Sequence, residues 1–203
     1  IIIYLVYYRC TNVEYIPDSN IETIIIIRHG EKPEADLGQL NCKGLNRSLA
    51  LPKYFRNNFP KPDYIFAAPT ELRDKGKEKY YYIRPLITIE PTAIYFEKKV
   101  NIGIPLANMF GNSTDVNKIT EVFINELLKN KYHSSTIYIA WEHLDMPVIA
   151  EHMFARYNMD KSIIPEWKKE DFDTVYVFEI NWNTNKLSFK IDKQGLNDVS
   201  AHC

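Results

Sequence analysis

The sequence lacks a strong net charge and any clustered cysteine motif. Its 25 lysine and arginine residues and 26 aspartate and glutamate residues give a formal net charge of −1. Electrostatics therefore gives no reason to expect nucleic acid or an anionic membrane as a partner. The three cysteines, Cys10, Cys42 and Cys203, lie far apart and include no CxxC pair. Their spacing indicates neither a zinc site nor a disulfide framework.

A long hydrophobic run, an internal repeat and a low-complexity segment are also missing. The apolar stretch Ile1–Tyr8 is too short to span a bilayer as a helix. It fits an edge strand or the remnant of a signal or anchor segment, and the chain begins with Ile1 and not with Met. We expect residues 1–22 to be an N-terminal extension. The cytoplasm is the favoured compartment, and export or envelope anchoring is the alternative if the stretch is a signal remnant.

The composition is that of an ordinary globular protein. The chain has 203 residues, of which 45% are hydrophobic and 25% charged. This length is enough for one well-packed domain and short for two. We expect residues 23–203 to form that single domain. The sequence indicates no oligomeric state.

The chain is organised around the stretch Thr23–Gly30, in which four isoleucines precede an Arg-His-Gly sequence. Four consecutive aliphatic residues are typical of a strand that is buried on both faces in the middle of a sheet. A cation and an imidazole at the end of such a strand are costly unless that end opens into a site. In open α/β sheets, ligands bind in the crevice there. The alternative is a strand that simply ends in a charged surface turn.

Strands and helices alternate along most of the chain. Further buried strands are predicted at Asp63–Ala68 and Thr136–Trp141, and a closing hairpin over Thr174–Ile180 and Lys186–Ile191. This alternation predicts an α/β fold, a three-layer αβα sandwich with a mainly parallel central sheet. The closing hairpin would add antiparallel strands at one edge.

A helix is predicted over Cys42–Asn57, capped by Asn41 and with Leu45, Leu49 and Phe55 turned inward. Pro52 should kink this helix.

Four further segments complete the prediction. The highly charged segment Glu71–Lys79 is predicted to be a solvated loop. The proline after Arg84 suits the first position of a helix, which Pro91 would limit to about two turns. Two more helices are predicted over Val116–Lys129 and Leu144–Tyr157.

Two histidines, His29 and His143, each follow a predicted buried strand. If these strands are parallel neighbours, the two imidazoles can face each other. Arg28 and Arg84 are candidates to converge on the same crevice, since guanidinium groups match phosphate oxygens. A neutral imidazole beside a bound phosphate can attack phosphorus and carry the phosphoryl group.

Metal binding is the rival interpretation for a pair of histidines. An ion would need further ligands and would lie beside two arginines, so electrostatics disfavours a metal. For His143 alone, a core histidine bonded to backbone is the other alternative.

The residues resemble the histidine phosphatase superfamily, which has the phosphoglycerate-mutase-like fold. Arg-His-Gly-Glu at residues 28–31 looks like the superfamily signature. The segment Leu40–Ala50 is similar to the helix start that follows the signature, and Asp63–Pro69 resembles the second strand, although Ala68 stands where serine is usual. His143 after a late strand resembles the second histidine, so the resemblance runs from about Thr23 to Ile180.

This resemblance implies roles for several residues. His29 would accept the phosphoryl group, Arg28 and a second arginine would bind phosphate, and His143 would stabilise charge in the transition state. It implies no metal and no organic cofactor.

Three departures from the family pattern affect this assignment. The second arginine could be Arg73 by spacing or Arg84 by its flanking residues, and we prefer Arg84. The family asparagine shortly after the signature has no clear counterpart. The usual proton donor is also missing, from the stretch before Gly111, and Glu142 and Asp145 are the candidates to replace it.

The leading hypothesis is a phosphatase that hydrolyses a phosphate ester of a small molecule or protein through a phosphohistidine on His29. The competing hypothesis is a non-catalytic module that binds phosphate or phosphopeptides and has lost the acid. A mutase is disfavoured because nothing matches the substrate-holding loops of mutases.

Overall fold

The computed structural model describes residues 20–75, 78–102 and 116–203. The expectations for Ile1–Tyr8 and for the stretch before Gly111 lie outside these ranges. The strands are β1 (Ile21–Arg28), β2 (Tyr64–Ala67), β3 (Leu72–Lys75), β4 (Glu78–Tyr81), β5 (Val100–Ile102), β6 (Thr136–Trp141), β7 (Thr174–Asn181) and β8 (Lys186–Lys193). The helices are α1 (Cys42–Asn58), α2 (Arg84–Phe96), α4 (Val116–Leu127) and α5 (Asp145–Arg156), with single 3-10 turns at Asn130–Tyr132 and Lys161–Ile163.

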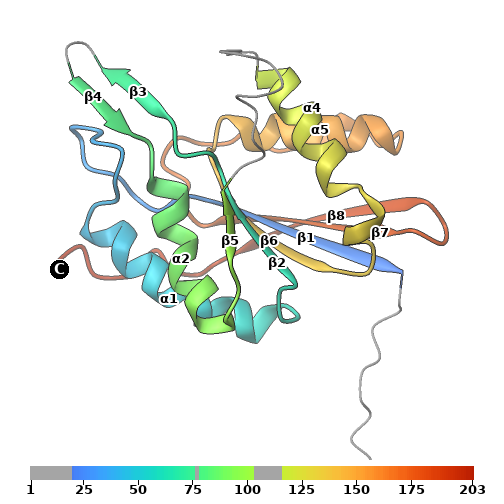
Figure 1. The fold of residues 1–203 in the computed structure, drawn as a ribbon, viewed down its shortest axis with the longest axis horizontal. Coiled ribbons are helices and arrows are strands. Elements are labelled where there is room, and N and C mark those ends of the chain that lie inside the picture. Colours follow the sequence, from blue (N-terminus) through green and yellow to red (C-terminus); the bar gives the residue numbers. More distant parts are fainter. Residues whose placement is uncertain (1–19, 76–77, 103–115) are drawn as a thin grey trace, which may run out of the picture.

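Six strands form one sheet in the order β5-β2-β6-β1-β7-β8. The first four of these are parallel to one another. Strand β7 is antiparallel to β1, and β8 is antiparallel to β7. Helices α1 and α2 cover one face of the sheet, and α4 and α5 cover the other (Figure 1). The predicted three-layer α/β fold, with its mainly parallel sheet and its C-terminal hairpin at one edge, is confirmed.

The four isoleucines of β1 divide between two hydrophobic cores. Ile25 and Ile27 pack in the cluster that includes residues of α1 and α2, whereas Ile24 and Ile26 pack in the cluster that includes residues of α4 and α5. Side chains alternate across a strand, so a strand with both faces covered needs an unbroken apolar run. This requirement explains the sequence of β1.

Helix α1 begins where the sequence predicts, because the Asn41 side chain accepts a hydrogen bond from the Gly44 amide at 2.9 Å. Its buried face, however, differs from the prediction. Leu45 and Leu49 are 38% and 60% exposed, and of the three predicted residues only Phe55 is buried. The buried stripe instead includes Arg47, whose guanidinium is bound by polar groups of the turn after β1 and of the C-terminal segment. A hydrophobicity pattern assigns no arginine to the inner face.

Two other segments differ from the prediction. The charged segment predicted as a loop forms the antiparallel hairpin β3–β4, seen projecting from the sheet in Figure 1. Helix α2 continues through Pro91 and has 13 residues. A proline removes one backbone donor and crowds the preceding turn. Packing of Ile89, Ala93 and Phe96 in the core offsets that cost.

Cys42 and Cys203 form a disulfide across a sequence separation of 161 residues, contrary to the prediction from cysteine spacing. The bond fastens the C-terminal segment to the first turn of α1, where the Asn46 amide also donates to the carbonyls of Ser200 and His202 at 2.8 and 2.9 Å. Spacing rules detect local cysteine pairs, and this pair is close only in the folded chain.

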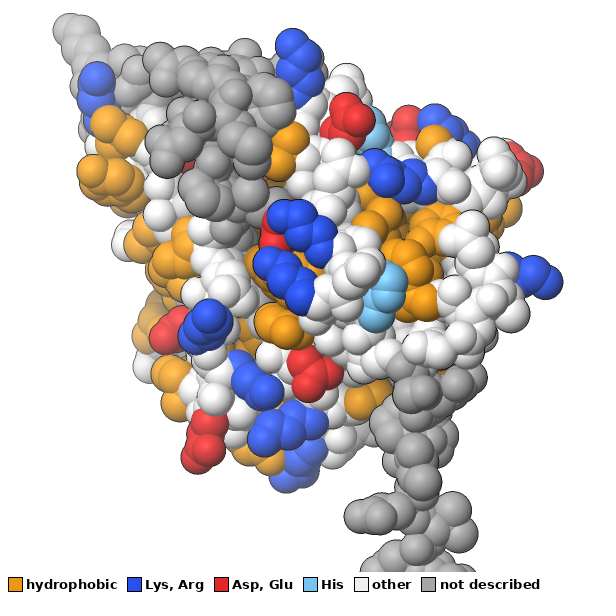
Figure 2. Space-filling model, turned by 45° about the vertical axis from the view of Figure 1, so that its right-hand side comes forward, with side chains coloured by type: hydrophobic (Ala, Val, Ile, Leu, Met, Phe, Trp, Pro, Cys, Tyr) orange, Lys and Arg blue, Asp and Glu red, His pale blue; other side chains and the backbone are white. Residues whose placement is uncertain are grey.

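None of the helices within the described ranges is long and apolar enough to cross a membrane. Figure 2 shows basic, acidic and hydrophobic side chains interspersed over one face of the molecule, as the small net charge leads one to expect.

Candidate active site

The register between β1 and β6 places the two predicted strand ends side by side. Arg28 pairs with Trp141, and the amide of His29 donates to the Trp141 carbonyl at 3.0 Å. The next residues on the two chains, His29 on one side and Glu142 and His143 on the other, therefore meet at the carboxyl edge of the sheet. The rings of the two histidines lie 6.5 Å apart between centroids and nearly perpendicular, at 87°.

Gly30 lets the turn after His29 approach α1 closely. A side-chain carbon on Gly30 would come within 2.9 Å of the Gly44 Cα and carbonyl oxygen, and one on Gly44 within 2.3 Å of the Glu31 carbonyl oxygen. The amide of Gly30 also donates to the Thr88 hydroxyl at 2.9 Å. The Arg-His-Gly sequence therefore fixes the histidine backbone against α1 and α2.

The imidazole of His29 is buried, and its position selects one tautomer. Its Nδ1 lies 2.7 Å from the carbonyl oxygen of Gly30. A carbonyl only accepts, so Nδ1 carries the hydrogen and Nε2 keeps its lone pair. Nε2 lies 3.7 Å from the Glu142 carboxylate, which is too long for a hydrogen bond. Burial lowers the pKa of His29, so the ring is neutral near pH 7.

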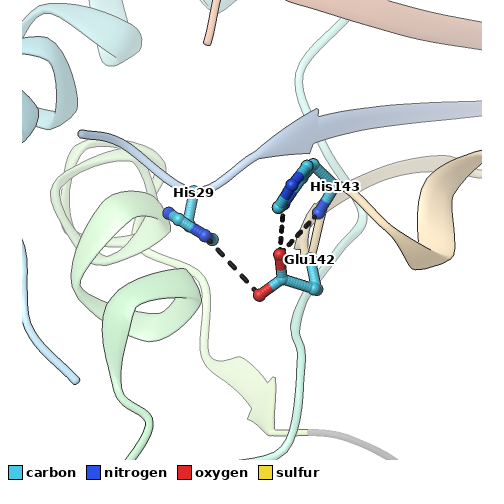
Figure 3. Close-up of side chains that lie close together, drawn as sticks. All are labelled: His29, Glu142 and His143. Atoms are coloured by element: carbon cyan, nitrogen blue, oxygen red, sulfur yellow. Dashed lines mark hydrogen bonds and ion pairs between the residues drawn. The ribbon is translucent and has the colours of Figure 1, made fainter. Parts of the chain in front are cut away.

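Glu142 lies between the two histidines, as Figure 3 shows. Its carboxylate accepts from the backbone amide of His143 at 3.2 Å, from the His143 ring and from the hydroxyl of Tyr82. Burial alone would raise the pKa of Glu142, but the hydrogen bonds from His143 and Tyr82 outweigh it and hold the pKa well below its usual range. The carboxyl is therefore ionised in the free protein.

Arg73 and Arg84 both line the cavity that contains His29, and so does Tyr82, which lies between them in the sequence. Arg84 has a 3% exposed side chain, forms an ion pair with Asp36 at 2.5 Å and keeps a buried Nε with no partner among the described residues. Arg73 is 39% exposed, and its Nη1 lies 4.0 Å from Glu142. Both guanidinium groups lie over the Tyr82 ring, at 3.7 Å for Arg73 and 4.5 Å for Arg84.

Arg28 does not line this cavity, contrary to the expectation that it would share a crevice with Arg84. Its Nη1 donates to the carbonyls of Lys169 and Asp171 at 2.6 and 2.9 Å, and its guanidinium lies 3.7 Å from the Phe172 ring centroid. Burial lowers the pKa of Arg28 to about 10, so it stays charged at neutral pH. It lines a neighbouring cavity and, like Arg84, has a buried Nε without a partner in the described ranges.

The cavity has a volume of about 460 Å³ and carries charges of both signs. Its wall includes three cationic side chains and four carboxylates. They are Lys32, Arg73, Arg84, Asp36, Glu71, Glu142 and Asp145. Burial, followed by the charge of Glu142, raises the pKa of Asp145. The predicted residues His29, His143, Glu142 and Arg84 are thus brought together around one space.

Tyr82 and the residues that support the turn after His29 were not predicted from the sequence. Tyr82 lies just after an unpredicted hairpin strand, so no pattern marked it. The acidic residue of the signature, Glu31, binds the Arg47 guanidinium through both oxygens at 2.8 and 3.0 Å. Arg47 also donates to Gln194 and Asn197, so it joins the turn after His29 to the C-terminal segment. The one signal in the sequence was the position of Arg47, which falls on the buried face of α1.

No protein-family model and no curated protein sequence matches this chain. Solved structures do match its fold. A mycobacterial glucosyl-3-phosphoglycerate phosphatase is 10% identical, with a TM-score of 0.55 and coverage of 85% of this chain and 97% of the other. A phosphoserine phosphatase variant from Entamoeba histolytica, in complex with phosphoserine, is 14% identical, with a TM-score of 0.55 and coverage of 86% and 98%.

A protein assigned as the phosphohistidine phosphatase SixA from Nakamurella multipartitia is 12% identical, with a TM-score of 0.54 and coverage of 85% of this chain and 95% of the other. At such low identities these likenesses concern the fold. The chain has the phosphoglycerate-mutase-like fold of the histidine phosphatases.

Proposed function

We propose that the protein is a phosphatase that hydrolyses phosphate esters through a phosphohistidine on His29. The observation that carries this proposal is the state of His29, a buried, neutral imidazole whose Nδ1 hydrogen is bonded to the Gly30 carbonyl. Its Nε2 lone pair faces a cavity that also holds arginine side chains. The activities named for the similarly folded proteins support the same chemistry.

The reaction takes two displacements. In the first, Nε2 of His29 forms a bond to phosphorus, the bond from phosphorus to the ester oxygen breaks, and the leaving oxygen takes a proton. In the second, a water oxygen attacks phosphorus, the bond to Nε2 breaks, and inorganic phosphate leaves. His29 is held by the strand end, so its nitrogen is aimed without a loss of orientation entropy at each encounter.

Arginine side chains and His143 bind the phosphoryl oxygens in this proposal. Arg84 offers the buried Nε that has no partner among the described residues, and it is the preferred second arginine. Arg28 lines the neighbouring cavity, and its contribution to phosphate binding is the positive charge that already interacts with Glu142. His143 stabilises the charge that develops in the transition state.

Glu142 is the proposed proton donor, and its ionised state in the free protein shapes how it works. A phosphate group beside the two histidines lies close to the carboxylate, and like charges raise a carboxyl pKa. Substrate binding therefore protonates Glu142, which then gives its proton to the leaving oxygen. Asp145, whose pKa is already raised, is the alternative donor in the same cavity.

Turnover of an aryl phosphate tests the proposal, because its good leaving group scarcely needs an acid. We expect phosphate release by the wild type and a loss of several orders of magnitude in His29→Ala. Glu142→Gln should retain most aryl phosphate turnover and lose turnover of alkyl phosphates. Binding of phosphate without turnover of any ester would instead support the non-catalytic binding module. A panel of phosphorylated metabolites and phosphopeptides then separates small-molecule from protein substrates.

A further inference from the structure

The two histidines and Glu142 form a set of metal-ligand atoms. One ring nitrogen of each histidine and one carboxylate oxygen of Glu142 all lie within 4.8 Å of one another. The three side chains come from two adjacent strand ends that the β1–β6 register fixes, and Figure 3 shows both histidine rings next to the Glu142 carboxylate, one at each oxygen. The set is therefore held by the sheet and not by a flexible loop.

Two imidazoles and one carboxylate are a donor set typical of zinc. Zinc sites that take part in chemistry use three protein ligands of this kind and leave a fourth position for water or another small ligand. The cavity in front of the three side chains, of about 460 Å³, provides space for that fourth ligand.

The groups around these ligands are also those of a metal site. Ligating histidines commonly donate their second ring hydrogen to a carbonyl or carboxylate, and ligating carboxylates are themselves hydrogen-bonded. His29 gives its Nδ1 hydrogen to the Gly30 carbonyl, which leaves Nε2 for an ion. Glu142 accepts from the Tyr82 hydroxyl. Both outer contacts are present in the structure.

The charges of the cavity do not oppose a cation. Its wall carries four carboxylates against the three cations Lys32, Arg73 and Arg84. Arg84 is paired with Asp36, and Lys32 lies 3.0 Å from the same carboxylate. Arg28 lines a neighbouring cavity, although its charge still interacts with Glu142. The cations on the wall are offset by its carboxylates, and Glu142 supplies the third ligand.

We propose that His29, Glu142 and His143 bind one Zn²⁺ ion, and that this ion and a phosphate ester exclude each other. Both need the Nε2 lone pair of His29, so an ion at this nitrogen blocks its attack on phosphorus. The exclusion rests on the proposed phosphatase function, whereas the binding of zinc does not.

Direct titration tests the binding. Chelator-treated protein is titrated with Co²⁺, whose visible absorption reports its coordination, and with Zn²⁺ in competition with a chromophoric chelator. We expect one ion per chain, and an affinity that falls at least about tenfold in Glu142→Gln. Glu151→Gln is the matched control, because Glu151 and His152 repeat the same dipeptide on α5, outside the cavity. This control should bind zinc as the wild type does.

Two results would overturn the zinc site: no binding at one ion per chain, or equal losses in the Glu142 and Glu151 variants. Thermal melting of each variant without metal checks that it is folded. In the activity arm, Zn²⁺ should inhibit aryl phosphate turnover competitively, and a chelator should restore it. Zinc that binds at the three residues but raises turnover would overturn the exclusion. If the wild type turns over no ester, the phosphatase proposal fails while the Co²⁺ titration still decides the metal site.

Discussion

Among the single residues of the site, Glu142 places a negative charge where a phosphoryl group would bind. Its carboxylate is ionised, and it lies between His29 and His143, in the space that a phosphoryl group would share. A second anion beside it raises the pKa of the carboxyl, because like charges repel each other. We therefore expect an incoming anion to bind together with a proton, so that anion binding depends on pH.

We predict that sulfate, a dianion across the neutral range, binds more weakly as pH rises. The free protein has Glu142 ionised and the complex has it protonated, so binding takes up one proton at a pH between the two pKa values. Calorimetric titrations between about pH 5 and pH 8 should show the affinity falling with pH in the wild type. Glu142→Gln should lose most of this dependence and bind sulfate more tightly at the higher pH. An unchanged slope in the variant would place the proton on a histidine.

The two arginines of the cavity are expected to differ in strength. Arg84 is buried and keeps an unpartnered Nε, whereas Arg73 is 39% exposed and more screened by solvent. A charge-assisted hydrogen bond contributes roughly 1.5–3 kcal/mol, so Arg84→Ala should weaken vanadate binding by about tenfold or more. Arg73→Ala is the matched variant and should have a smaller effect. The reverse order in vanadate titrations would identify Arg73 as the phosphate-binding arginine.

Among the elements, α1, together with Thr88 of α2, supports the turn after His29. Its first turn contacts Gly30, its buried Arg47 binds Glu31, and its first residue is joined to the C-terminal residue by a disulfide. These contacts tie the C-terminal segment to the back of the active site. The segment is therefore expected to contribute to stability.

We predict that loss of the disulfide destabilises the protein by about 2–5 kcal/mol, because the cross-link restricts a long loop in the unfolded chain. Thermal melting should show a lower Tm for Cys42→Ser/Cys203→Ser, and for the wild type under reducing conditions. The double variant is its own control, since a reductant should not lower its Tm further. A wild type that melts at the same temperature after thiol titration has shown full reduction would contradict the prediction.

Strands β1 and β6 are predicted well because their burial is nearly continuous. The C-terminal hairpin is predicted for another reason, the turn residues that join a buried strand to the more exposed β8. Hairpin β3–β4 is missed because its many charged residues read as solvated. The inner face of α1 is missed because it contains Arg47, whose partners are distant in the sequence.

In the candidate site, too, some residues could be predicted from the sequence and others could not. His29 and His143 mark strand ends, so the pairing of those strands could be expected to bring them together. The hydrogen bond from Tyr82 and the turning of Arg28 toward Lys169 and Asp171 depend on tertiary contacts that no local pattern encodes.

For the whole molecule, the strand order explains why the site lies where it does. Strand β1 lies inside the sheet, between parallel β6 and antiparallel β7, so its carboxyl end near the start of the chain is flanked by segments from the second half of the sequence. Disulfides persist mainly in oxidising compartments. The Cys42–Cys203 bond therefore favours export over the cytoplasmic location suggested by the sequence, and we propose export as the location to test.

Detection of a covalent intermediate on His29 is the decisive experiment for the proposed phosphatase. Rapid quench of the wild type with an aryl phosphate that carries labelled phosphorus should trap a phosphoenzyme that is labile to acid and stable to base, as expected of a phosphorus–nitrogen bond. Peptide mapping should place the label on His29, and His29→Ala should give none while retaining the wild-type fold. His143→Ala should form the intermediate more slowly. Turnover by His29→Ala at a rate comparable to the wild type, or a label on another residue, would contradict the account.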